Sequence, residues 1–353
     1  MNNSRMPTVN LPYLGIRFQI RYHKCNLTCP YCIAHWKENE NHFDLGRFTA
    51  IIDKIKELPY RVCLRIGIGG EIFTSREIPA AIRSICNEEN NIFGVSFSSN
   101  LNADWDKVIA PFIGSVDTSR LGMGCTLHDT VIDDIDGFFE KVKRLKDSGV
   151  LLYVGYVALP GRIEFLKKYK RRCDDIGVPM LLNQLEGKLI GVESADLDLH
   201  YPRDYTLREI KELRELWGTP HSYKILLESC RTRGMACSAG KNYIYMGFDG
   251  QVRPCGPIQS SLGNILTDEI SFQENDTICP MERCPCGNEN QALRIVDKHY
   301  DRTRTLRIYY PKKDISAKLL YKGYNPSVYD RGSPMPLIQK ALSLFRRCKS
   351  STP

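Results

Sequence analysis

The feature that most constrains the fold of this 353-residue chain is the alternation of strand-like and helix-like segments over its first half. Strands are expected where residues alternate apolar and polar or form short apolar runs, and helices where apolar residues recur every three or four positions. The expected strands are 13–22, 62–68, 92–98, 120–127, 150–158 and 179–185, and the expected helices are 43–57, 76–88, 105–112, 132–148 and 162–176. Six strands separated by helices predict βαβ units and a parallel sheet, and leave open whether the sheet is curled.

A loop with three cysteines follows the first expected strand: Cys25-Asn26-Leu27-Thr28-Cys29-Pro30-Tyr31-Cys32. Three thiolates this close cannot all pair in disulfides, but they can converge on one metal centre. Thiolate ligands select zinc, copper or iron–sulfur clusters over hard cations. Zinc and ordinary four-iron clusters take four protein ligands, and the next cysteine here is Cys63. The loop therefore predicts a cubane with one iron open to a non-protein ligand.

The composition agrees with a metal-binding globular protein. A hydrophobic content of 42% is ordinary for a chain with a sizeable core. We find no secretory signal and no apolar run that approaches the length of a membrane span. Clustered cysteines in a long, core-rich chain indicate metal binding in a reducing compartment, so we expect a cytoplasmic protein.

The spacing Cys25-x3-Cys29-x2-Cys32, with the aromatic Tyr31 before the last cysteine, resembles the cluster loop of the radical S-adenosylmethionine (SAM) superfamily. The resemblance implies a partial (β/α)6 barrel and a [4Fe–4S] cluster whose open iron is chelated by SAM. One electron then cleaves SAM to a 5′-deoxyadenosyl radical that takes hydrogen from a substrate. Cys25, Cys29 and Cys32 are thus the predicted catalytic residues, and a zinc loop is the alternative.

Further resemblance to this superfamily lies at the ends of the expected strands. Gly69-Gly70-Glu71 is similar to its GGE motif, whose backbone meets the methionine amino group of SAM, and glycine lets a backbone approach a ligand closely. Polar residues also end the later strands, although strand ends are often polar in any protein. The residues predicted to contact the cofactor are Tyr31, Gly69, Gly70, Glu71, Ser99, Asn100, Thr126, His128 and Asn183.

A second cysteine region begins at Cys237. The spacing to Gly250 and Cys255 resembles the opening of the auxiliary-cluster extensions called SPASM and twitch. Asp249-Gly250 between two apolar stretches predicts a β-hairpin that brings both cysteines to its base. Gly263-Asn264-Ile265, which follows, is also typical of the family. We expect one auxiliary [4Fe–4S] cluster, or alternatively zinc, held by Cys237, Cys255 and two of Cys279, Cys284 and Cys286.

These features divide the chain into three parts. Residues 1–205 form the expected barrel, 206–288 a small cysteine-rich α+β domain that opens with a helix capped by Asp204 or Thr206, and 289–353 a basic extension of unknown role. The formal net charge of +8 resides in that extension, since residues 301–353 carry twelve Lys or Arg and three Asp or Glu. This distribution argues against nucleic acid in the core. A basic amphipathic segment over 336–349 permits membrane contact, but packing on its own domain is favoured.

The sequence therefore predicts a radical SAM enzyme in which an auxiliary cluster assists oxidation of a small molecule, such as a sugar or aminocyclitol. A reducing partner such as flavodoxin or ferredoxin is implied. About a dozen residues precede the first expected strand, so we expect no leader-binding domain there, which favours a small molecule over a peptide. The alternatives are a peptide maturase with a separate leader-binding protein, an epimerase with Cys63 or Cys125 as hydrogen donor, and a non-enzymatic zinc or iron–sulfur scaffold.

Overall fold

The protein is built around one nine-stranded sheet. The computed structural model describes residues 13–32, 43–183, 203–216, 233–234 and 236–281. The strands lie in the order β10-β9-β8-β1-β2-β3-β4-β5-β6. The six expected strands are β1 (Tyr13–Gln19), β2 (Arg61–Gly67), β3 (Ile92–Ser99), β4 (Leu121–Leu127), β5 (Leu151–Val157) and β6 (Met180–Asn183). Each pairs in parallel with the next, so the predicted βαβ organisation is confirmed.

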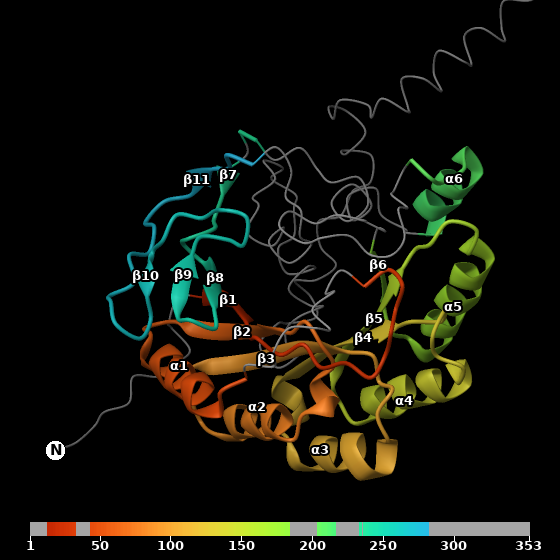
Figure 1. The fold of residues 1–353 in the computed structure, drawn as a ribbon, viewed down its shortest axis with the longest axis horizontal. Helices are drawn as coiled ribbons and strands as arrows, with labels where there is room; N and C mark the ends of the chain where they lie inside the picture. Colours follow the sequence, from red (N-terminus) through yellow and green to blue (C-terminus); the bar gives the residue numbers. More distant parts are fainter. Residues whose placement is uncertain (1–12, 33–42, 184–202, 217–232, 235, 282–353) are drawn as a thin grey trace, which may run out of the picture.

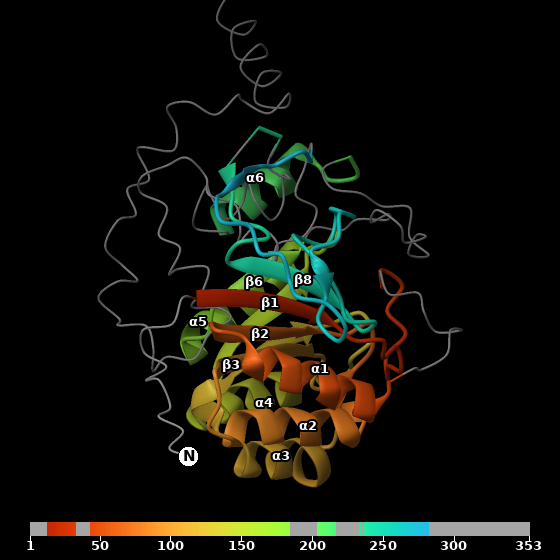
Figure 2. The ribbon, with the colours of Figure 1, turned by 90° about the vertical axis from the view of Figure 1, so that its left-hand side faces the viewer.

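Five helices cover the convex side of the curled sheet (Figure 1; Figure 2). They are α1 (Leu45–Glu57), α2 (Glu77–Asn87), α3 (Ala110–Ser115), α4 (Ile135–Asp147) and α5 (Ile163–Ile176). Short turns η3 (Ile72–Thr74), η4 (Trp105–Ile109) and η5 (Thr118–Arg120) lie between them. The single helix expected over 105–112 is instead the π-helical turn η4 running directly into α3. The α/β barrel-type architecture predicted from the sequence is therefore confirmed.

The two faces of each barrel strand differ in chemistry. On β1, Leu14, Ile16 and Phe18 are fully buried and join the core formed with the apolar side of α1. Because successive side chains of a strand point to opposite faces, Arg17 and Gln19 lie on the concave side. The same alternation recurs on β2, where Leu64 and Ile66 are part of the helix-side core. The helix side is thus apolar, and the concave side is free to carry polar groups.

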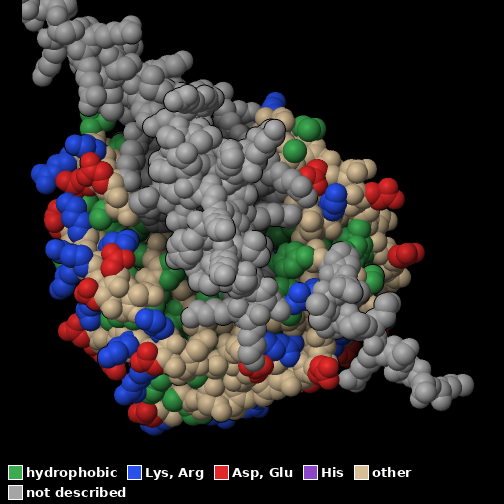
Figure 3. Space-filling view, turned by 180° about the vertical axis from the view of Figure 1, so that it is seen from behind, with side chains coloured by type: hydrophobic (Ala, Val, Ile, Leu, Met, Phe, Trp, Pro, Cys, Tyr) green, Lys and Arg blue, Asp and Glu red, His purple; other side chains and the backbone are tan. Residues whose placement is uncertain are grey.

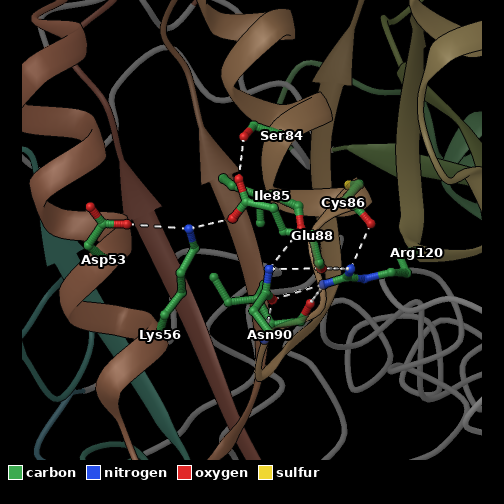
Figure 4. Close-up of polar contacts among 9 residues, drawn as sticks. Asp53, Lys56, Ser84, Ile85, Cys86, Glu88, Asn90 and Arg120 are labelled. Carbon is green, nitrogen blue, oxygen red and sulfur yellow. Dashed lines mark hydrogen bonds and ion pairs between the residues drawn. The ribbon is translucent and has the colours of Figure 1, made fainter.

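Polar contacts fasten the outer helices to the sheet (Figure 4). The ammonium of Lys56 on α1 bonds Asp53 at 3.3 Å and Glu88 at 2.7 Å, and Ser84 bonds Glu88 at 2.6 Å. The guanidinium of Arg120 donates to the backbone carbonyls of Cys86, Glu88 and Ile92 and to the Asn90 side chain. The Arg120 contacts satisfy carbonyls that the end of α2 leaves without a helical partner. They therefore join α2 to the starts of β3 and β4.

The predicted hairpin continues the barrel sheet. Strand β8 (Tyr243–Gly247) pairs in parallel with β1, and β9 (Gln251–Arg253) returns antiparallel to it. Gly250 has φ +84°, which explains glycine at this turn. Strand β10 (Gly263–Asn264) pairs with β9, while β7 (Ala236–Cys237) and β11 (Thr277–Ile278) form a separate small sheet. The sheet therefore crosses the domain boundary expected at residue 205.

Helix α6 (Leu207–Leu216) begins with a capping box. The Thr206 hydroxyl accepts the N–H of Glu209 at 3.2 Å, and the Glu209 carboxylate accepts the N–H of Thr206 at 2.8 Å. Thr206, one of the two candidates, is thus the cap. Lys167 of α5 bonds Glu212 of α6 at 3.0 Å. Basic and acidic side chains are interspersed along one side of the molecule (Figure 3, left). The extension 289–353 lies outside the described residues, among which no helix is long and apolar enough to cross a membrane.

Candidate active site

The three-cysteine loop leaves the carboxyl end of β1 and is fixed by the end of β2. The N–H groups of Gly69 and Gly70 donate to the carbonyl of Tyr22 at 3.2 and 2.9 Å, and the N–H of Glu71 donates to the carbonyl of Lys24 at 2.8 Å. A Cβ on residue 70 would lie 2.2 Å from the Lys24 oxygen. Glycine is therefore required at position 70 so that the two backbones can meet directly before Cys25.

The Glu71 side chain points into the protein. It is 2% exposed, and its carboxylate accepts hydrogen bonds from the Ser99 hydroxyl at 2.8 Å, the Asn100 N–H at 2.6 Å and the Phe73 N–H at 3.2 Å. Burial raises the pKa of the Glu71 carboxyl, and these hydrogen bonds oppose the shift. Three residues of the predicted cofactor set, Glu71, Ser99 and Asn100, thus form one buried network at the ends of β2 and β3.

Asn100 connects this network to the cysteine loop. Its amide nitrogen lies 2.8 Å from the Asn26 side-chain oxygen and 3.8 Å from the Cys25 sulfur. The next residue, Leu101, has φ +54°, a left-handed conformation that is uncommon for a large side chain. The sequence carried no sign of this backbone feature. Strained backbone of this kind occurs often at ligand sites.

Tyr31 and His128, both predicted to contact the cofactor, contact each other. The Tyr31 hydroxyl lies 3.2 Å from Nδ1 of His128, and their rings stack with centroids 5.9 Å apart. Thr130 adds a hydroxyl contact to Tyr31 at 3.4 Å. Burial lowers the pKa of His128 to about 4, so its imidazole is neutral at pH 7. The pair attaches the far end of the loop to the end of β4.

The donor set of the loop fits an iron–sulfur cluster. Cys25 is exposed and Cys32 partly exposed, while Cys29 is buried in an apolar cluster with Leu27 and Tyr31. The N–H of Leu27 lies 3.5 Å from the Cys25 sulfur, and such donors to sulfur tune these clusters. No three metal-binding side chains of the described residues converge on one ion position, but a cubane does not require this because each thiolate binds a different iron.

Thr126 and Asn183 lie together on the concave side, further along the sheet. Their side chains come from β4 and β6, and both border Gly155 of the intervening strand β5. A Cβ on residue 155 would lie 3.5 Å from the Thr126 hydroxyl and 3.8 Å from the Asn183 amide. Among the described residues, the predicted cofactor residues therefore form three groups of contacts, around Glu71, around Tyr31 and around Gly155.

The hairpin brings together three of the five cysteines that were predicted for the auxiliary site. Cys237, Cys255 and Cys279 share one small buried cluster with Ala239 and Tyr243. Thr277 of β11 pairs with Cys237 of β7. The segment that leads into Cys279 therefore lies beside Cys237. Cys284 and Cys286 lie outside the described residues. The choice between an iron–sulfur cluster and zinc at this site stays a prediction.

One ion pair with a buried carboxylate was not expected from the sequence. The Asp129 side chain is 1% exposed, and its carboxylate bonds Arg162 at 2.6 Å and the Tyr156 hydroxyl at 3.1 Å. Asp129 directly follows His128, so the ion pair connects the end of β4 to the start of α5. Asp129 and Arg162 are 33 positions apart in the chain, so no local sequence pattern marks this pair.

The two strand cysteines lie on opposite faces. Cys125 is fully buried in the helix-side core, where burial raises the pKa of its thiol, so it does not face the barrel interior. Cys63 packs against Tyr153 on the concave side. A hydrogen donor to a substrate in the barrel must reach the concave side, and only Cys63 of the two is on it.

Comparison with curated proteins finds two heme synthases, and no family model matches the chain. The AdoMet-dependent heme synthase of Nitratidesulfovibrio vulgaris is 18% identical over 276 residues, which cover 68% of this chain and 73% of that protein. The enzyme of the same name from Oleidesulfovibrio alaskensis is 23% identical over 172 residues, which cover 41% and 44%.

Comparison with solved structures finds similar folds in proteins with bound S-adenosylmethionine. Streptococcus suis SuiB bound to S-adenosylmethionine aligns with a TM-score of 0.51 and 13% identity, covering 75% of this chain and 66% of SuiB. For anSMEcpe with bound AdoMet and Cp18Cys peptide the TM-score is 0.52 and the identity 18%, covering 73% and 78%. The fold is that of a radical SAM enzyme. This shared fold and the two relatives named as AdoMet-dependent agree with the resemblance that the Cys25–Cys32 loop carries. The SPASM or twitch assignment stays a prediction.

Proposed function

We propose that the protein reductively cleaves SAM and uses the 5′-deoxyadenosyl radical to take a hydrogen atom from its substrate. A [4Fe–4S] cluster held by Cys25, Cys29 and Cys32 would supply the electron. The observation that carries the proposal is the anchored loop, which the N–H groups of Gly69 and Gly70 hold at the carboxyl end of β1. Barrels of parallel strands carry their chemistry at this end.

The surrounding residues have distinct tasks in this proposal. Glu71 is a positioning residue, because its buried carboxylate holds Asn100 against Asn26 and Cys25. Tyr31 and Leu27 surround Cys29 with apolar groups and keep water from it. Thr126 and Asn183, beside the bare backbone of Gly155, are proposed to contact the adenosyl part of SAM.

We propose an auxiliary [4Fe–4S] cluster on Cys237, Cys255 and Cys279, completed by Cys284 or Cys286. It would accept one electron from the substrate radical while a proton leaves to a base, so that the substrate is oxidised by two electrons in all. Flavodoxin or ferredoxin would supply the separate electron that cleaves SAM. Four thiolates satisfy zinc equally well, and zinc would favour redox-neutral chemistry such as epimerisation.

Two substrate classes are candidates. A small molecule such as a sugar or aminocyclitol is the class proposed from the sequence. A peptide is the second candidate, and it is favoured by two similar folds: SuiB bound to the precursor peptide SuiA, with a TM-score of 0.51, and anSMEcpe bound to the Cp18Cys peptide.

The test is anaerobic reconstitution of the full chain. We expect about eight iron and eight sulfide per chain, and 5′-deoxyadenosine from SAM after reduction with dithionite. Cys25→Ala should abolish 5′-deoxyadenosine formation, because the cluster would lose one of its three thiolate ligands. Cys86→Ala, which changes a buried cysteine of α2 on the outer side, is the control and should retain it. SAM cleavage by Cys25→Ala at the wild-type rate would contradict the proposal.

A further inference from the structure

The side-chain amide of Asn100, directly after β3, has a fixed orientation. Its oxygen accepts the backbone N–H of Asn102 at 2.8 Å, so its nitrogen is the end that faces the cysteine loop. That nitrogen donates to the side-chain oxygen of Asn26 at 2.8 Å and lies 3.8 Å from the Cys25 sulfur. An amide nitrogen carries two hydrogens, and these two contacts use both. Asn100 therefore directs an N–H group at a predicted cluster ligand.

The backbone around this amide is held from two layers of the fold. The N–H of Asn100 donates to the buried carboxylate of Glu71 at 2.6 Å. The next residue, Leu101, has φ +54°, and Lys141 of the outer helix α4 donates to the carbonyls of Leu101 and Ala103 at 2.9 and 3.0 Å. A left-handed residue of this kind persists only where the surrounding contacts determine it. The position of Asn100 is thus set by the barrel before any ligand is considered.

The Cys25 sulfur has donors near it from two separate segments. The backbone N–H of Leu27, at 3.5 Å, belongs to the loop itself. The amide of Asn100 comes from a residue 75 positions later in the chain. Hydrogen bonds to the thiolates of an iron–sulfur cluster stabilise the form that carries more negative charge, which is the reduced one, and so raise its reduction potential. A donor held as firmly as Asn100 can therefore set that potential.

We propose that Asn100 is a positioning residue that acts through Cys25: its amide donates to the Cys25 sulfur and raises the reduction potential of the cluster at the first site. A higher potential makes it easier for the cluster to accept the one electron that cleaves SAM. This role differs from the contact to SAM predicted for Asn100, because it operates before SAM binds. The inference rests on the proposed function and adds to it a residue that controls electron uptake at the same site.

The test is a redox titration of the reconstituted full chain without SAM, reduced stepwise with titanium(III) citrate and followed by electron paramagnetic resonance. The signal of the first site is the one that Cys25→Ala lacks. In Asn100→Leu, which keeps a similar size but has no donor, the equilibrium constant for one-electron reduction should fall about tenfold, which lowers the potential by about 59 mV. Asn102→Ala is the matched control and should keep the wild-type potential. Alanine retains the N–H and carbonyl through which Asn102 contacts Asn100 and Asn26.

A lower potential in Asn100→Leu, at the iron content of wild type, supports the inference. An unchanged potential in Asn100→Leu, or an equal fall in Asn102→Ala, overturns it and leaves the proposed function standing.

A second variant decides if Asn100→Leu fails to bind iron. Asn100→Asp keeps the shape of the side chain and the acceptor for the Asn102 N–H, but it places a carboxylate beside Cys25. Its potential should fall at least as far as that expected for Asn100→Leu, and a wild-type potential in Asn100→Asp would overturn the inference. If no signal of wild type is missing in Cys25→Ala, no cluster is bound at Cys25, which contradicts the proposed function and this inference together.

Discussion

The two cysteine sites depend on very different amounts of structure. The Cys25–Cys32 loop continues β1, a central strand, and backbone hydrogen bonds from Gly69, Gly70 and Glu71 hold it. The second site rests on β7 and β11, which have two residues each, and on a buried cluster of five residues. The first site is held by two central strands of the sheet, and the second lies next to the hairpin β8–β9 that extends the same sheet toward its edge.

This difference indicates what each site requires in order to form. The contacts that hold the first loop are backbone hydrogen bonds from the residues that follow β2, so the barrel itself sets the path of the loop. In the part of the second site that the structure describes, the buried apolar cluster has only five residues. Metal binding contributes folding free energy in such small sites, often on the order of 10 kcal/mol. We therefore expect metal to be bound by a preformed loop at the first site and to complete folding at the second.

The largest expected effect is that of Gly70→Ala, which disturbs the backbone contact between the barrel and the first loop. The new Cβ would lie 2.2 Å from the backbone oxygen of Lys24, so one of the two backbones must move. We expect the free energy of unfolding to fall by about 2–3 kcal/mol. Iron bound at the first site and SAM cleavage should each fall more than tenfold.

Gly114→Ala is the matched control for that change. A Cβ on Gly114, in α3, meets nothing within 4 Å, and alanine is the better helix former. Urea denaturation, iron analysis and 5′-deoxyadenosine assay compare the two variants with wild type. If Gly70→Ala kept its iron and its activity, the first loop would not depend on the barrel as described.

A smaller and more local effect is expected from Cys237→Ala at the second site. The variant should lose about four iron atoms, and the amide protons of β7 and β11 should lose protection from exchange. Protection in β2 to β4 should remain, because those strands belong to the main core. Hydrogen exchange followed by mass spectrometry checks this, with Cys173→Ala on α5 as control. Equal loss of protection in the barrel would mean that the two sites fold as one unit.

The barrel was predictable because its signals are local. The strand expected over 62–68 is β2, Arg61–Gly67, and the helix expected over 132–148 is α4, Ile135–Asp147. Apolar periodicity marks such elements whatever their neighbours are. The cysteine loop was predictable for the same reason, since its three thiols lie within eight residues.

Contacts between distant segments were not predictable in this way. The hydrogen bond between Glu71 and Ser99 depends on how the ends of β2 and β3 lie next to each other. The pairing of β8 with β1 joins residues more than 200 positions apart, and no periodicity records it. The reach of Tyr153 to Arg65 depends on Gly124 in a third strand. A single sequence shows which residues are available, but these pairings follow only from the curled sheet.

The smallest expected effect is a pH dependence that belongs to the first site. The pKa of His128 is about 4 in the folded protein, below its ordinary value of 6.5, so between these values the unfolded chain binds a proton that the folded protein does not. Stability contributed by neutral His128 is thus present above pH 6.5 and is lost as pH falls toward 4. We expect the free energy of unfolding of the apoprotein to fall by about 2 kcal/mol between pH 7 and pH 5 from this group.

His128→Gln isolates that contribution, because glutamine fills similar space and does not titrate. Residues 236–281, which hold the second site, contain no histidine, so the difference between wild type and variant reports the first site alone. Urea denaturation of both proteins at pH 7 and pH 5 gives the measurement. A pH dependence that is the same in His128→Gln as in wild type would show that His128 is not held neutral against Tyr31. The loop would then lack the attachment to β4 that sets it apart from the second site.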